Sequence, residues 1–173
     1  DRIVGVAICD ANDDILLSGR RGKCIRFPVI DVRVFKSRDS VGVRGIRLVG
    51  DDELIAMSIV RHAEFDSDTR DRYLRWSNAR RRAEGEGESS ADPLPSAPEQ
   101  ADEMAAAEQF VLSITENGYG KRTSAYEYRV TGRGGQGIIN IEASDRNGPV
   151  VASAPVEEDH HIMLVTDTGR LIR

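Results

Sequence analysis

A unit of about fifty residues occurs twice in full and twice as a fragment in this chain, and this repetition constrains the fold more than any other feature. The unit opens with a strand, a turn that places Gly beside Lys or Arg, and a second strand. This opening pattern begins at Ile15, at Phe110 and at Ile162. Because a unit of this size cannot bury its apolar face without neighbours, the period predicts radial or solenoid repetition.

Each complete unit also contains a middle strand and a closing strand. The middle strand is repeated at 43–46 and 135–138, and the closing strand at 3–6, 54–57 and 150–153. About four short strands per unit is the content of one propeller-like blade. We therefore predict an all-β, propeller-like array of four-stranded blades. We assign residues 1–14 to the end of a preceding blade, 15–60 and 110–156 to complete blades, and 157–173 to the start of a following one. Since no initiator Met is present, we expect a piece of a larger array.

Alternating apolar residues predict two further strands. In the first strand, one face would carry Tyr126, Tyr128 and Val130. In the second, one face would carry Ile30 and Val34. The Asn-Gly pairs at 117–118 and 147–148 are typical of tight turns between strands, because both residue types tolerate positive φ.

Residues 61–109 interrupt the repeats with a different composition. Their sequence predicts a charged helix at 68–83, a flexible linker rich in Gly, Glu, Ser and Pro at 84–98, and a short helix at 99–109. An insertion between repeats usually forms an appendage on one face of the array.

The distribution of charge matters more than the net charge of −5. Residues 61–109 hold 7 basic and 12 acidic residues, so the repeats keep 17 of each sign. No apolar run approaches the roughly 18 residues that a membrane span needs, and no signal peptide is visible. Cys9 and Cys24 lie in apolar stretches, and we interpret them as reduced, buried thiols.

Three motifs suggest a cofactor, phosphate or metal site, but the residues around each motif argue against that site. Residues 132–137 spell G-x-G-x-x-G, but a strand pattern follows where a dinucleotide site needs a helix. Residues 118–122 lack the first Gly and the hydroxyl residue of a phosphate loop. His160 and His161 follow an acidic run, but adjacent strand residues point to opposite faces, which favours a solvated turn over a metal site. We identify no catalytic constellation.

Cations beside Gly-rich turns are the candidate functional residues. A solvated surface is the ordinary explanation of any one of them, but repetition at matching places would line the rim of the array with positive charge. Such a rim suits the phosphate backbone of double-stranded DNA, and glycine would let phosphate approach the main chain closely. The candidates are Lys23, Arg26, Arg44, Arg47, Lys121, Arg122, Arg129, Arg133, Arg146, Arg170 and Arg173.

Three segments carry a resemblance to a known family. Residues 41–48, 115–123 and 165–173 resemble the C-terminal domain of the bacterial DNA gyrase A protein. The resemblance implies a six-bladed β-pinwheel that wraps DNA, so that an ATP-dependent type II topoisomerase introduces negative supercoils. It also implies two protein partners, the gyrase B protein with its ATP and Mg²⁺ and a second gyrase A protein, and a bacterial cytoplasmic location.

The resemblance has limits that shape the expected function. The family's gyrase box is absent, since residues 131–137 match it only in Arg133 and the glycines, and no tyrosine stands in the context of the family's nucleophile. We therefore expect this segment to bind DNA and to perform no chemistry. The related C-terminal domain of the topoisomerase IV A protein remains an alternative. A propeller-type scaffold for protein interaction is another, although Trp-Asp and Gly-His blade signatures are missing.

Overall fold

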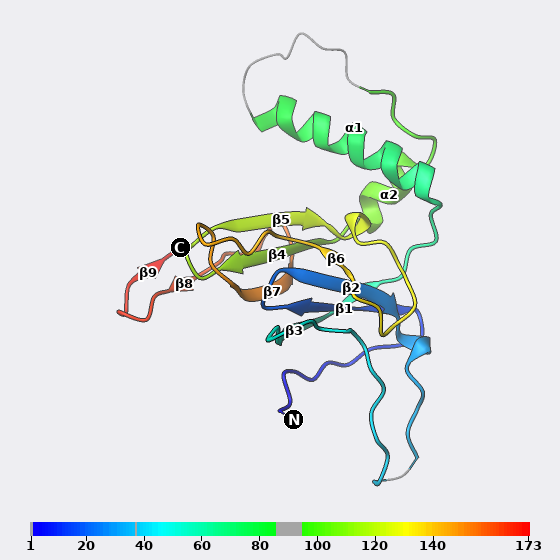
Figure 1. Ribbon diagram of the computed structural model, residues 1–173. Helices are drawn as coiled ribbons and strands as arrows, with labels where there is room; N and C mark the ends of the chain where they lie inside the picture. Colours follow the sequence, from blue (N-terminus) through cyan, green and yellow to red (C-terminus); the bar gives the residue numbers. More distant parts are fainter. Residues whose placement is uncertain (1, 37, 86–94) are drawn as a thin grey trace.

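The structure is a computed structural model that describes residues 2–36, 38–85 and 95–173. Within these residues the strands form three antiparallel sheets, and both α-helices come from the insertion (Figure 1). The prediction of an all-β repeat architecture is confirmed. None of the helices in the described ranges is long and apolar enough to cross a membrane.

The first sheet has the strand order β3-β1-β2-β6 and is shared between the repeats. Strands β1 (Asp13–Gly19), β2 (Lys23–Pro28) and β3 (Leu54–Arg61) belong to the first repeat. The outer strand β6 (Ile138–Ile139) comes from the second repeat and pairs with the start of β2. A sheet is therefore not built from one contiguous unit, which corrects the expectation of four strands from each repeat.

The second sheet has the order β5-β4-β7 and repeats the geometry of the first. Its strands are β4 (Phe110–Thr115), β5 (Gly120–Ser124) and β7 (Val150–Val156). The two sheets share a register irregularity, after Ser18 in β1 and after Ile114 in β4. A small third sheet pairs β8 (Leu164–Val165) with β9 (Leu171–Ile172). All three predicted opening hairpins are confirmed.

Two other predicted strands are wrong. Residues 126–131 contain a 3₁₀ turn (Ala125–Glu127) and one isolated bridge, from Val130 to Arg26. Residues 32–36 and 38–49 extend from the sheets as an open arm, on which Val34 is 87% exposed (Figure 1). Residues 3–6 have no strand partner within the described residues, and the assignment of residues 1–14 to a preceding blade stays a prediction. Alternation alone does not make a strand, because the backbone also needs a partner to complete its hydrogen bonds.

The core lies between the sheets and joins the repeats. One buried cluster contains residues from both repeats, and a second lies within the first sheet. The first consists of Leu16, Cys24, Val60, Val111 and Tyr128, and the second of Leu17, Ile25 and Phe27. Tyr128 is thus buried as its alternating pattern indicates, although it is not in a strand. Cys9 and Cys24 are both free thiols, but Cys9 is exposed, which corrects the expectation that both are buried.

The insertion packs against the second repeat. Helix α1 (Ser67–Gly85) spans the expected helix, and α2 (Ala101–Ala107) is shorter than expected. Most of the expected linker, residues 86–94, lies outside the described residues. Tyr73 of α1 and Met104 of α2 are buried in one cluster with Tyr126, and the two tyrosine rings meet edge to face at 5.6 Å. The insertion therefore shares a core with the repeat that follows it.

Two equivalent glycines offer a test of how tightly the repeats interlock. Gly22 and Gly118 both turn their hairpins at φ +83°. A Cβ on Gly22 would stand 1.9 Å from the carbonyl oxygen of Ile141, whereas Gly118 has nothing within 4 Å. Gly118→Ala should lower the free energy of unfolding by about 1–2 kcal/mol, the cost of left-handed backbone. Gly22→Ala should lower it several kcal/mol further, because it breaks the contact between repeats. Urea denaturation measures both, and equal losses would contradict this account.

Candidate nucleic-acid interface

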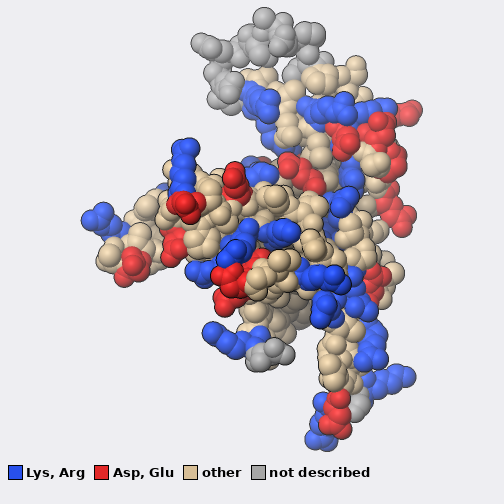
Figure 2. Space-filling model, viewed as in Figure 1, with Lys and Arg blue, Asp and Glu red and all other residues tan. Residues whose placement is uncertain are grey.

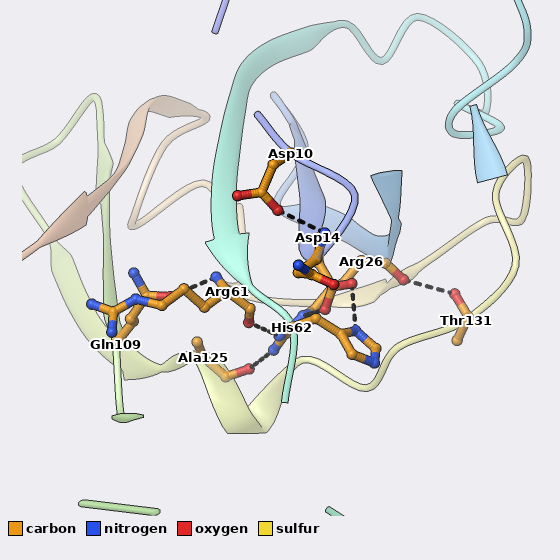
Figure 3. A network of polar contacts seen from close by, with 9 residues as sticks. Asp10, Asp14, Arg26, Arg61, His62, Gln109, Ala125 and Thr131 are labelled. Atoms are coloured by element: carbon orange, nitrogen blue, oxygen red, sulfur yellow. Dashed lines mark hydrogen bonds and ion pairs between the residues drawn. The ribbon is translucent and has the colours of Figure 1, made fainter. Parts of the chain in front are cut away.

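Arg26 lies at the centre of a buried polar network rather than on the surface (Figure 3). Its Nε donates to Asp14 Oδ2 at 2.7 Å, and the two side chains are 3% and 0% exposed. Its Nη1 donates to the carbonyl oxygen of Ala125 at 2.7 Å, and its Nη2 to that of Arg61 at 2.8 Å. These bonds satisfy the guanidinium without solvent, so Arg26 is not available to a phosphate. Its prediction as a DNA-binding residue is wrong.

The same network gathers groups from three parts of the chain. His62, at the start of the insertion, places Nδ1 2.8 Å from the second oxygen of Asp14. The backbone N–H of Thr131 donates to the carbonyl oxygen of Arg26 at 2.9 Å. Burial lowers the pKa of Arg26, and the charge of Asp14 opposes that change. Asp14 and His62 are structural residues that sequence analysis missed. The available signal was an aspartate within the apolar strand β1.

Arg122 occupies the position in the second sheet that Arg26 occupies in the first. Leu16 faces Arg26 across the ladder, and Leu112 faces Arg122 in the same way. The residue equivalent to Asp14 is Phe110, and the Arg122 guanidinium lies over its ring, 3.9 Å from the centroid. Arg122 is exposed and pairs with Glu158. At this ladder position the second sheet therefore has an aromatic neighbour and an exposed arginine, where the first sheet has an acid and a buried arginine.

Four arginines from the two repeats meet where the arm crosses the Gly-rich loop. We call Arg44, Arg47, Arg129 and Arg133 the crossing cluster, and all four are exposed. The backbone N–H of Arg47 donates to the carbonyl oxygen of Gly135 at 2.7 Å. Arg133 reaches back and donates to the carbonyl oxygens of Asp31 and Arg44, at 2.9 and 3.2 Å. Arg129 and Gly135 line the same hollow, of about 190 Å³, beside β2.

Glycine has a packing role in this loop. A Cβ on Gly137 would stand 2.1 Å from the carbonyl oxygen of Cys24, and its φ of +71° also favours glycine. Gly137 thus lets the loop approach β2 so that β6 can pair with it. Packing against β2 therefore accounts for the glycine at position 137 without the close approach of a phosphate.

Two lysines lie together beside β6. Lys23 is paired with Ile139 in the ladder, and Lys121 Nζ donates to the carbonyl oxygen of Asn140 at 3.3 Å. Lys121 also lies 3.6 Å from a carboxylate oxygen of Glu127. Burial raises the pKa of the Cys24 thiol to about 12, and the nearby charge of Lys121 limits the rise.

The remaining candidates are exposed but differ in their partners. Arg146 lies over the Tyr119 ring at 5.2 Å, and its Nε donates to the hydroxyl at 3.1 Å. Arg173 lies 3.4 Å from His161. In the part of the chain that the structure describes, five candidate side chains have neither a hydrogen bond nor an ion pair: Lys23, Arg44, Arg47, Arg129 and Arg170. Figure 2 shows basic side chains over α1, along the sheets and on the arm, with acidic ones between them.

One exposed group could be mistaken for a metal site. Ligand atoms of Glu157, Asp159 and His160 lie within 4.8 Å of one another, the only such group among the described residues. All three are exposed, and His160 Nδ1 accepts the backbone N–H of Glu157 at 3.2 Å. Exposed acidic groups of this kind are common without a metal ion, and the solvated acidic turn stays a prediction.

Comparison with known proteins identifies the family. The model of the DNA gyrase C-terminal domain, a β-propeller, matches residues 13–61 and 109–157. The chain belongs to this family. It is 47% identical to the DNA gyrase A protein of Granulibacter bethesdensis and 44% identical to that of Rickettsia bellii, each over the whole chain. The chain spans 20% and 19% of those two proteins. The resemblance stated above is therefore confirmed.

Solved structures support the fold. The crystal structure of the C-terminal domain of DNA topoisomerase IV matches 94% of this chain and 37% of its own, with a TM-score of 0.61 and 14% identity. The structure of a DNA gyrase A C-terminal domain also matches 94% of this chain and 37% of its own. Its TM-score is 0.56 and its sequence identity is 17%. At these identities the likeness concerns the architecture alone.

The contrast between Arg26 and Arg122 can be tested by mutation. Asp14→Asn leaves the Arg26 charge buried without its carboxylate, and the free energy of unfolding should fall by about 3–5 kcal/mol. Arg122→Ala at the equivalent exposed position should cost about 1 kcal/mol or less. Urea or thermal denaturation compares the two variants. A small effect of Asp14→Asn would show that water reaches the pair.

Proposed function

We propose that this chain binds the phosphate backbone of duplex DNA and bends it, as the DNA-wrapping part of a gyrase A protein. Its similarity to the DNA gyrase A proteins of several bacteria over its whole length supports this assignment. In the complete enzyme, wrapping would present a chosen DNA segment to the cleavage gate and bias strand passage toward negative supercoils.

The observation that carries the proposal is the crossing cluster. Its arginines come from two segments that hydrogen-bond to each other, and within the described residues none of the four pairs with a carboxylate. Like charges gathered without acidic partners raise the local positive potential, which attracts a polyanion. Among the described residues, the side chains of Lys23 and Arg170 also have neither a hydrogen bond nor an ion pair.

The expected binding is independent of sequence. The repeats contribute no α-helix that could enter a major groove and read base edges. Contacts from Arg and Lys to phosphate oxygens position a protein on DNA without reading the bases. Bending 20–30 base pairs through 40–90° costs about 1–6 kcal/mol, so contacts must be distributed along the curve to offset the cost.

Chemistry belongs to other parts of the proposed enzyme. The nucleophilic tyrosine would lie elsewhere in the gyrase A protein, and the gyrase B protein would bind ATP and Mg²⁺. The partners would be the gyrase B protein, a second gyrase A protein and double-stranded DNA, in the bacterial cytoplasm. Relatives named as gyrase over the whole chain favour gyrase over topoisomerase IV, and an intact gyrase box in the flanking sequence would exclude the latter.

The salt dependence of DNA binding tests the proposed interface. Arg44, Arg47 and Arg129 should be changed together to Gln, with Arg133 kept because it supports two backbone carbonyls. The slope of log affinity against log salt should become shallower by about 2.7, from about 0.9 per phosphate contact, equally for unrelated sequences. Arg21→Gln is a control, since that exposed arginine already pairs with Asp51. An unchanged slope would remove the crossing cluster from the DNA path.

The same triple variant separates wrapping from chemistry in the full-length enzyme. Negative supercoiling should fall strongly, while ATP-free relaxation and DNA cleavage should persist, because the cluster lies outside the proposed catalytic parts. The two activities are compared on plasmid DNA at several enzyme concentrations. Equal loss of both would indicate misfolding, and full retention of supercoiling would show that wrapped DNA avoids the cluster.

A further inference from the structure

Helix α1 of the insertion has a distribution of charge that the net charge of the insertion conceals. Residues 61–109 carry a balance of −5, yet residues 72–83 hold five arginines and no acidic residue. Asp68 and Asp71 lie near the N-terminal end of the helix, where negative charge suits its dipole. Beyond that end, α1 is a basic element.

Three of these arginines share the outward face of the helix. At 3.6 residues per turn, Arg72, Arg75 and Arg82 lie on one side, with about 10 Å along the axis between the last two. All three are exposed, and the opposite side carries the buried residues Tyr73 and Ser77. Arg72 has one exposed pair, 3.6 Å from Asp68, whereas Arg75 and Arg82 have no ion pair to any described residue. Asp68 and Asp71 lie on the same side, one turn before Arg72 and Arg75, but Arg75 and Arg82 lie farther along the helix than either carboxylate.

The helix is held in a defined place on the second repeat. Tyr73 packs in the cluster with Met104 and Tyr126, and its hydroxyl donates to Glu108 at 2.9 Å. Arg81 pairs with the same carboxylate at 2.6 Å. These contacts position the outward face relative to the sheet beneath it.

The inward side of α1 meets the second sheet beside Arg122. Arg81 of α1 and Arg122 of β5 both lie over the ring of Phe110, at 4.8 and 3.9 Å from its centroid. Figure 2 shows basic side chains at several places along α1, with acidic ones gathered near one end. One arginine of the insertion therefore lies beside a cation of the repeats, and each of the two pairs with a carboxylate, that of Glu108 or of Glu158.

We propose that the outward face of α1, formed by Arg72, Arg75 and Arg82, is a second phosphate-binding surface that extends the DNA path from the repeats onto the insertion. This inference rests on the proposed function. A protein partner would need aromatic or aliphatic anchors, but Leu74 and Trp76 pack inward against the cluster. The fork of donors on arginine matches a phosphate group and can bind it through two hydrogen bonds.

The test compares two triple variants in the full-length protein, using a random-sequence DNA duplex. Changing Arg72, Arg75 and Arg82 together to Gln should make the salt slope shallower by about 2.7 and should shorten the hydroxyl-radical footprint. Changing the same three to Lys keeps the charge and should preserve most of the slope. Circular dichroism should show equal helix content, because these side chains are exposed.

The outcomes distinguish this inference from the proposed function. If the Gln variant keeps the slope and footprint of the unaltered protein while the crossing-cluster variant loses affinity, α1 lies off the DNA path and the inference fails alone. If the unaltered protein shows no salt-dependent binding, the proposed function fails as well. If the Gln variant keeps its DNA slope but loses binding to polyglutamate, the surface serves an acidic protein, and the inference is overturned.

Discussion

The buried pair of Arg26 and Asp14 is the interaction on which the arrangement of the repeats depends. A charge removed from water is tolerated only where partners satisfy it, and Arg26 finds one carboxylate and two backbone carbonyls. The carbonyls belong to Arg61, at the end of β3, and to Ala125, in the second repeat. The pair thereby joins the first sheet, the start of the insertion and the turn that precedes the Gly-rich loop. Residues 132–139 can then cross to the first sheet and add β6.

Strand sharing also explains how a functional surface arises from scattered cations. Arg44 and Arg47 belong to one repeat, Arg129 and Arg133 to the next, and the crossing of the two segments brings them together. Equivalent positions do not guarantee equivalent roles. Arg26 and Arg122 share one ladder position, but the first is buried beside an aspartate and the second is exposed beside an aromatic ring. The binding surface of a repeat array thus depends on what surrounds each cation as much as on its recurrence.

The insertion is acidic overall, but helix α1 within it contains a basic segment. All of its acidic residues lie outside residues 72–83, and apolar residues of α1 face inward to share a core with Tyr126. A helix with a polar outer face needs such an anchor to remain folded, because most helical stability comes from packing. The same packing that stabilises α1 aims its remaining arginines at solvent.

The sequence by itself determined the repeat architecture, the three hairpins, helix α1 and the family, because strand pairs and helices are local and their turn residues recur at a fixed period. Tertiary structure decided the rest. Strand β6 joins a sheet of the other repeat, and the segment at 32–36 remains unpaired, because a strand depends on a distant partner that no local pattern specifies. Likewise, only packing distinguished Arg26 from the exposed cations, since burial of a charge depends on groups that lie far apart in the sequence.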